Sequence, residues 1–235
     1  MATILDNIQH VRRRIAEACA AAQRPADSVE LVCVGKTRSA DEIRAAFDAG
    51  ERLFGENYVQ EGLDKIAALA DLRSRIVWHL IGPLQSNKTR AVAAAFDWVD
   101  SVDRLKIAER LNEHRPPDLP PLQICLQVNI SGEASKSGLP PAEVAAVAAA
   151  VAAMPRLELR GLMAIPAPAV GLEAQREPHR RLRELMNTLT GAGHRLGHRF
   201  DTLSIGMSDD LDAAILEGAT MVRIGTAIFG ARPPA

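Results

Sequence analysis

Short apolar runs alternate with segments whose apolar residues recur at helical spacing. Such runs are typical of buried parallel strands, because both faces of these strands are covered. The pattern predicts strands at 31–36, 53–54, 76–81, 97–102, 122–130, 157–165, 200–205 and 221–224, with helices between them. Residues 4–22 predict one further helix before the first strand, because their apolar positions lie three or four residues apart.

This alternation belongs to the α/β class and predicts a single (β/α)8 barrel of the TIM type with an extra N-terminal helix. The 235 residues, 47% of them hydrophobic, suffice for one barrel, and no internal linker stands out. We therefore expect one domain over 1–235, with the N-terminal helix at 1–24 and the barrel at 29–230. A doubly wound open sheet is the alternative, disfavoured because no glycine-rich dinucleotide loop follows the first strand.

Composition and charge disfavour several classes of function. The formal net charge of −1 predicts neither a nucleic-acid-binding nor a membrane-binding surface. No apolar run is long enough to cross a bilayer, and the N-terminus does not resemble a signal peptide. The cysteines, Cys19, Cys33 and Cys125, form no CxxC pair, which is typical of a reducing, cytoplasmic setting. A low aromatic content of 3% favours a monomer.

The first predicted strand ends abruptly in a charge. Val32, Val34 and Lys36 share one face of this strand, because side chains alternate along it. Ligands of parallel α/β folds bind at the carboxyl ends of the strands. A lysine placed there is a candidate for a Schiff base, because desolvation lowers the pKa of its amine. The alternative is a lysine that extends into solvent, which is the commoner arrangement.

The loops after the seventh and eighth predicted strands have the composition of an anion site. Met207-Ser208 and Gly225-Thr226 offer glycine, hydroxyl groups and backbone N–H groups at the start of a helix. Ordinary turns capped by Ser208 and Thr226 are the alternative. Arg223 lies two residues before Gly225, so both face the same side of the strand. An arginine that faces the interior of the barrel requires a hydrogen-bond acceptor there.

Closure of the barrel would place the eighth strand beside the first. An amine, a guanidinium and a phosphate cradle would then meet at one mouth. Pyridoxal 5'-phosphate offers a matching aldehyde, ring nitrogen and phosphate. The pattern therefore predicts this compound as the cofactor.

The sequence also resembles the family of pyridoxal phosphate homeostasis proteins, which share the barrel of the alanine racemase N-terminal domain. The matching segments, specific in combination, lie at 34–37, 54–58, 79–88, 128–131, 135–138, 161–166, 203–210 and 222–226. The resemblance implies an internal aldimine on Lys36 and phosphate contacts from Ser208, Gly225 and Thr226. It also implies that Arg223 faces the pyridine nitrogen.

An arginine in that place favours binding over turnover. It can only donate, so the ring nitrogen stays unprotonated and the ring is a weaker electron sink. Alanine racemases also use a second domain and a tyrosine base, as the resemblance implies, whereas Tyr58 is the sole tyrosine here. We predict a carrier or buffer without catalytic residues, whose partners are the cofactor and the apoenzymes that depend on it. A racemase-like enzyme and an aldolase using Lys36 are the alternatives.

Other residues carry weaker expectations. Asn57 is expected to line the mouth, and His79 to contact the ring or a water, with hydrogen-bonded packing as the alternative for His79. His194 and His198 are spaced like helical metal ligands, but flanking glycines disfavour a helix there, and we predict no metal site. Gly35 stands where the family resemblance leads us to expect serine, and we expect it to loosen packing beside the lysine.

Overall fold

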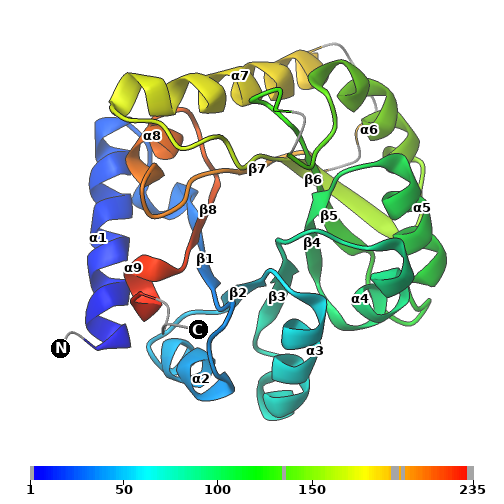
Figure 1. Cartoon of the computed structure of the whole chain (residues 1–235), viewed down its shortest axis with the longest axis horizontal. Coiled ribbons are helices and arrows are strands. Elements are labelled where there is room, and N and C mark those ends of the chain that lie inside the picture. The colour runs from blue at the N-terminus through cyan, green and yellow to red at the C-terminus, as the bar shows by residue number, and fades with distance from the viewer. Residues whose placement is uncertain (1–2, 134–135, 192–195, 197–198, 232–235) are drawn as a thin grey trace.

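The computed structural model describes residues 3–133, 136–191, 196 and 199–231. Its parallel strands form a closed barrel in which sequence neighbours are also spatial neighbours (Figure 1). They are β1 (Glu30–Val34), β2 (Leu53–Glu56), β3 (Val77–Leu80), β4 (Trp98–Val102), β5 (Leu122–Gln127), β6 (Leu157–Met163), β7 (Thr202–Ser204) and β8 (Met221–Ile224). Because β8 pairs with β1 from Glu30 to Cys33, the predicted barrel is confirmed.

Helices surround the barrel and follow the strands along the chain (Figure 1). They are α2 (Ala40–Asp48), α3 (Val59–Ala68), α4 (Thr89–Ala95), α5 (Leu105–His114), α6 (Val144–Ala152), α7 (Leu172–Gly191), α8 (Leu211–Leu216) and α9 (Thr226–Phe229). Short 3-10 turns lie at η1 (Ala26–Ser28), η2 (Ala70–Leu72), η3 (Ser86–Lys88) and η4 (Pro141–Glu143). No helix in the described part of the chain is both long and apolar enough to cross a membrane.

The predicted N-terminal helix is present as α1 (Ile4–Ala21). Thr3 and Asp6 close its first turn by accepting each other's backbone N–H groups. Its apolar stripe, including Ile8, Val11 and Ile15, is buried. Figure 1 shows α1 running alongside α8 and α9, the helices that follow the last two strands. This position lets α1 contact the loops at one side of the barrel mouth.

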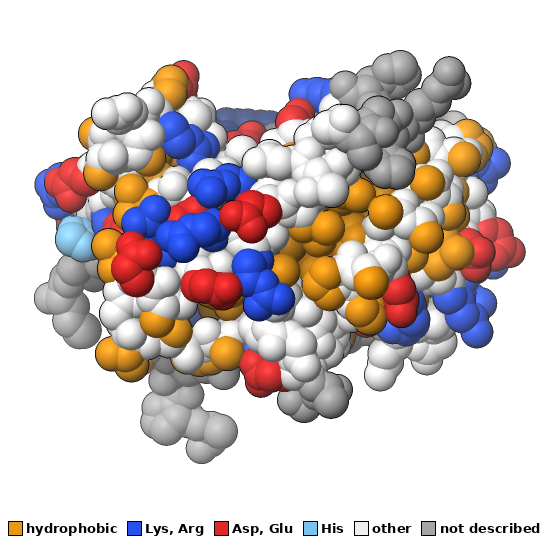
Figure 2. Space-filling model, turned by 90° about the horizontal axis from the view of Figure 1, so that it is seen from above, with side chains coloured by type: hydrophobic (Ala, Val, Ile, Leu, Met, Phe, Trp, Pro, Cys, Tyr) orange, Lys and Arg blue, Asp and Glu red, His pale blue; other side chains and the backbone are white. Residues whose placement is uncertain are grey.

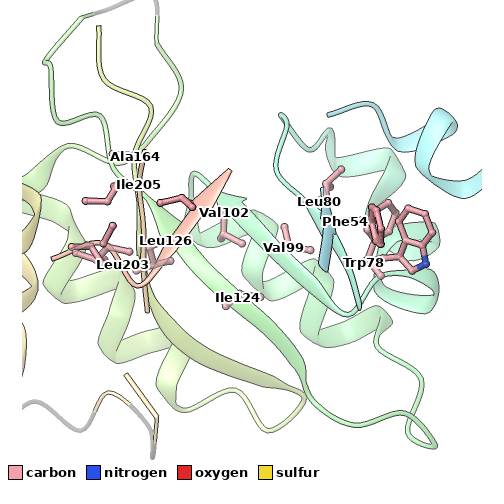
Figure 3. Close-up of a cluster of buried hydrophobic side chains, with 14 of the residues drawn as sticks. Phe54, Trp78, Leu80, Val99, Val102, Ile124, Leu126, Ala164, Leu203 and Ile205 are labelled. Carbon is pink, nitrogen blue, oxygen red and sulfur yellow. The ribbon is translucent and has the colours of Figure 1, made fainter. Parts of the chain in front are cut away.

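The main hydrophobic core lies between the strands and the helices. Outward-facing side chains such as Phe54, Trp78 and Leu80 are fully buried there (Figure 3). Burial of each such side chain contributes about 1.5–3 kcal/mol, so this layer dominates the stability of the barrel. A smaller apolar cluster lies inside the barrel and consists of Val32, Trp98, Cys125, Met163 and Met221. Towards the carboxyl ends of the strands the interior becomes polar.

The outer surface along α7 carries paired charges. Arg176, Arg180 and Arg183 all contact the carboxylate of Glu217, which is itself 1% exposed. Figure 2 shows basic and acidic side chains side by side on this face of the molecule. The arginines of α7 therefore neutralise a buried carboxylate and tie α7 to the end of α8.

Candidate functional site

A pocket of about 350 Å³ opens at the carboxyl ends of the strands. The turns after β1, β2, β3, β6 and β7 contribute to its wall, together with β8 and the start of α9. Its lining is Val34, Lys36, Asn57, Ile81, Ile165, Met207, Ser208, Asp209, Arg223, Gly225 and Thr226. Every predicted site residue except His79 is in this lining. The amine that follows the first strand, the arginine of the last strand and both glycine-hydroxyl loops thus meet at one place.

Lys36 lies in a tight turn just beyond β1, two residues later than the end of the strand. Gly35 O accepts a hydrogen bond from Arg38 N at 3.0 Å, which closes a four-residue turn around Lys36 and Thr37. The strand ladder continues as far as Gly35, whose N–H donates to Gly55 O at 2.9 Å. The lysine is therefore carried by a turn and not by the strand, and its side chain still faces the pocket.

A buried ion pair lies behind this turn. Lys65 Nζ in α3 donates to Gly35 O at 2.6 Å and to the two carboxylate oxygens of Glu56 at 2.8 and 2.9 Å. Burial raises the pKa of Glu56 to about 7, although Lys65 opposes this shift. Sequence reasoning missed both residues. The available signal was a carboxylate at the end of β2, on the face that packs against helices, where a charge requires a partner.

Gly35 allows this carboxylate to pack against the turn. A Cβ added at Gly35 would lie 2.7 Å from Glu56 Oε1 and 2.5 Å from Ile43 Cδ1. Both separations are shorter than real Cβ contacts, so one neighbour would have to move. The expectation that Gly35 loosens the packing beside the lysine is therefore wrong, because the space is already filled.

The raised pKa of Glu56 predicts that the free energy of unfolding depends on pH. Its pKa rises from 4.5 to about 7 on folding, so between these values the folded state keeps a proton that the unfolded state releases. The contribution of Glu56 to the free energy of unfolding falls as pH rises through this window, by ~3 kcal/mol in total, and is constant above it. Urea unfolding from about pH 5 to 8 should show this fall as the difference between the native protein and Glu56→Gln. A flat difference would contradict the prediction.

Arg223 is buried beneath the pocket and donates hydrogen bonds to Ser204 in β7 and to Ala164 just after β6. Its Nη1 donates to Ser204 O at 2.6 Å and to Ser204 Oγ at 2.8 Å, and its Nη2 donates to Ala164 O at 2.9 Å. Ser204 Oγ in turn donates to Asp100 Oδ2 at 3.0 Å. Burial lowers the pKa of Arg223, and Asp100 is the largest influence that opposes it. The guanidinium stays charged, because arginine holds its proton even when buried.

His79 lies in the interior of the barrel and not in the pocket wall. It lies in β3, two positions before the pocket residue Ile81, which follows the strand. Its ring stacks on Trp98 with centroids 5.0 Å apart, and its Nδ1 is 3.0 Å from Asp100 Oδ1. Its Nε2 is buried with no hydrogen-bond partner in the described structure. In the tautomer with its proton on Nδ1, His79 donates to Asp100 and Nε2 carries no hydrogen, so no buried donor lacks an acceptor. The geometry therefore fits a hydrogen-bonded packing residue, which was the alternative for His79.

The N-terminal helix is attached to one loop of the pocket and to helix α9. Arg14 Nη1 donates to Ser208 O at 2.7 Å, and Arg14 forms an ion pair with Asp212 in α8. Asn7 Nδ2 donates to Ile228 O in α9 at 2.8 Å. Sequence reasoning gave α1 no part in the site. Its contacts join residues about two hundred positions apart, and no local pattern marks them.

The described residues hold no group of three or more His, Cys, Asp or Glu arranged to bind a metal ion. His194 and His198 lie outside the described residues.

Comparisons with known proteins agree with the fold. Residues 4–233 match the family described as alanine racemase, N-terminal domain. The crystal structure of a protein from Bifidobacterium adolescentis has 38% identity and a TM-score of 0.90, covering 96% of this chain and 94% of that one. PipY of Synechococcus elongatus with PLP bound has 38% identity and a TM-score of 0.80, covering 92% and 100%. The protein is therefore a barrel of the alanine racemase N-terminal domain class.

Curated relatives match over nearly their whole length. The pyridoxal phosphate homeostasis protein of Pseudomonas aeruginosa is 59% identical over 232 residues, which is 99% of this chain and 97% of the relative. That of Escherichia coli is 53% identical over 233 residues, or 99% and 98%. The chain belongs to the family of pyridoxal phosphate homeostasis proteins, as the resemblance of its motifs indicated.

Proposed function

We propose that this protein binds pyridoxal 5'-phosphate through a covalent bond between Lys36 Nζ and the aldehyde carbon, with loss of water. It acts in the cytoplasm as a carrier or buffer of this compound for apoenzymes. The observation that carries the proposal is the convergence of Lys36, Arg223 and both glycine-hydroxyl loops on one pocket. The bound compound supplies an electrophilic aldehyde and an electron-withdrawing ring.

Each part of the pocket suits one part of this compound. The Ser208 hydroxyl and the Gly225-Thr226 turn suit the phosphate, because they offer donors without bulk. Arg223 suits the ring nitrogen, because a guanidinium can only donate. PipY, 38% identical to this chain, has been solved with PLP bound, which supports the assignment.

The same pocket supports binding without turnover. A ring nitrogen that accepts from Arg223 stays unprotonated, which weakens the ring as an electron sink. Tyr58, the sole tyrosine of the chain, is 55% exposed and is not in the lining of the pocket. It is therefore not placed as the partner base that a racemase would require.

The test is the spectrum and the chemistry of the purified protein. We expect visible absorbance from the bound compound and, after borohydride reduction, a mass adduct on the peptide that contains Lys36. Amino acids incubated with the protein in deuterated water should show no exchange of the α-proton. An adduct confined to another lysine would overturn the assignment, and steady α-proton exchange would replace the carrier with a racemase-like enzyme. A colourless protein that traps a keto substrate under borohydride would indicate an aldolase.

Replacing Arg14 is expected to weaken binding of the phosphate group selectively. Arg14→Met removes the contact that holds Ser208 O, so the affinity for pyridoxal 5'-phosphate should fall about five- to tenfold, as for the loss of one hydrogen bond to a charged group. The affinity for pyridoxal, which lacks the phosphate, should be unchanged. Arg13→Met, at the exposed neighbouring position, is the matched control. Equal losses for both ligands would show that Arg14 acts on the fold and not on the phosphate loop.

A further inference from the structure

Thr37 adopts a backbone conformation that its residue type disfavours. Its φ is 63°, and among the described residues other than glycine only Gln23 shares a positive φ. A β-branched side chain is an outlier in this region, because its Cβ substituents crowd the backbone. Such a conformation persists only where the surroundings hold it, and it tends to occur at functional sites. Here the outlier directly follows Lys36.

Charged side chains hold the backbone on both sides of the lysine. Glu61 Oε2 accepts a hydrogen bond from Thr37 N at 2.9 Å. Lys65 Nζ donates to Gly35 O at 2.6 Å, and Glu56 fixes the position of Lys65. The carbonyl that precedes the lysine and the amide that follows it are therefore both tied to β2 and α3.

These contacts are not explained by stability alone. A buried ion pair such as that of Lys65 and Glu56 contributes little net stability, because desolvation of the charges offsets their attraction. The geometric effect of this pair is specific. Gly35 O already accepts the hydrogen bond from Arg38 N that closes the turn, and Lys65 donates a second hydrogen bond to the same oxygen. The arrangement is suited to fixing the direction of one turn.

We propose that Glu61, Lys65 and Glu56 are positioning residues that hold the strained turn and thereby aim Lys36 Nζ into the pocket. This inference rests on the proposed function of Lys36. Without these contacts Thr37 relaxes towards a negative φ, the adjoining peptide rotates, and the lysine points into the pocket in only a fraction of the molecules. The apparent dissociation constant then rises in inverse proportion to that fraction.

The first test is Glu61→Ala, because Glu61 is the most exposed of the three and its loss leaves no buried charge unpaired. We expect the affinity for pyridoxal 5'-phosphate to fall about three- to tenfold. The affinity for pyridoxine 5'-phosphate, whose alcohol cannot bond to an amine, should stay within about twofold, because only the position of the lysine has changed. Glu61→Gln keeps an acceptor oxygen and should retain most of the affinity. Asp64→Ala, exposed on the same helix, is the matched control.

The second test is suppression by relief of the strain. Asparagine adopts a positive φ more readily than a β-branched residue. Adding Thr37→Asn to Glu61→Ala should therefore restore the affinity for pyridoxal 5'-phosphate to within about twofold of the native protein. In the protein freed of ligand, amide exchange at residues 36–38 should be faster in Glu61→Ala and slow again in the double variant.

The possible outcomes separate the two proposals. Unchanged binding in Glu61→Ala, equal losses for both phosphorylated ligands, or no recovery with Thr37→Asn would each overturn the positioning role. The proposed function would still stand in these cases, provided that the native protein carries its adduct on Lys36. A native protein without that adduct would overturn the proposed function and, with it, this inference.

Discussion

Replacing Lys36 by methionine is expected to weaken the binding of pyridoxal 5'-phosphate about a hundredfold, which corresponds to ~2.7 kcal/mol. Methionine has similar length and no amine, so the covalent bond is lost while the phosphate and ring contacts remain. Reduction with borohydride should leave no adduct at position 36. Equilibrium binding followed by absorbance, together with peptide mapping, measures both effects.

The matched control is Lys88→Met, which removes an exposed lysine of the η3 turn. It should bind like the native protein. Native affinity in Lys36→Met would show that the covalent bond contributes nothing and that the phosphate and ring contacts account for the binding. The affinity for pyridoxine 5'-phosphate should be the same in all three proteins, because that ligand forms no bond to the amine.

Replacing Asp100 by alanine is expected to lower the free energy of unfolding by about 3–5 kcal/mol. Asp100 is fully buried and accepts hydrogen bonds from Ser204 Oγ and His79 Nδ1. Its removal leaves the Nδ1–H of His79 without an acceptor and takes a counter-charge from the buried Arg223. Urea unfolding of the protein without ligand measures the loss, so this prediction does not depend on the proposed function.

Asp100→Asn should lose less stability than Asp100→Ala, because its amide oxygen still accepts one of the two hydrogen bonds. Asp118→Ala, at an exposed loop position, should change the free energy of unfolding by less than about 0.5 kcal/mol. A loss below about 1 kcal/mol in Asp100→Ala would show that the barrel interior tolerates the charge of Arg223 without a nearby carboxylate. The hydrogen bonds of Asp100 to Ser204 and His79 would then not stabilise the fold.

The sequence predicted the order and number of the strands well, and their ends less well. The apolar runs mark the strands because both faces of each strand are covered, one by helices and the other by the barrel interior. The predicted fifth strand at 122–130 continues past the observed end of β5 at Gln127, because Val128 forms only an isolated bridge with Leu139 and Ile130 lies in a turn, although both are buried. Burial alone does not distinguish such positions from strand residues.

The sequence also predicted most of the pocket lining. Lys36, Arg223, Ser208 and Thr226 follow or end strands, and barrel topology brings all such positions to one mouth. His79 also lies near the end of its strand, but it is deeper in the barrel than the pocket wall and contacts Asp100. The depth of a residue in the barrel depends on the stagger between strands, which no local pattern encodes.

Sequence reasoning missed the residues that support the pocket. In the sequence, Glu56 is only an acidic residue at the end of a strand, and Lys65 is only a lysine of a helix. Arg14 is one of three consecutive arginines. Each acquires its role from a partner on another element: Gly35 O for Lys65, and Ser208 O for Arg14. Every residue has a backbone carbonyl, so the sequence does not indicate which of them accepts a side-chain hydrogen bond. These contacts can be identified only in the three-dimensional structure.

By itself, then, the sequence determined a closed eight-stranded barrel and the set of side chains at its mouth, since hydrophobic periodicity and strand direction are local properties of the chain. Only the tertiary structure decided that Lys36 sits in a strained turn, that His79 belongs to the interior, and that α1 holds the loop after β7 and helix α9 after β8. These features depend on which distant groups come within hydrogen-bonding distance, and that is set by the packing of whole helices on the barrel.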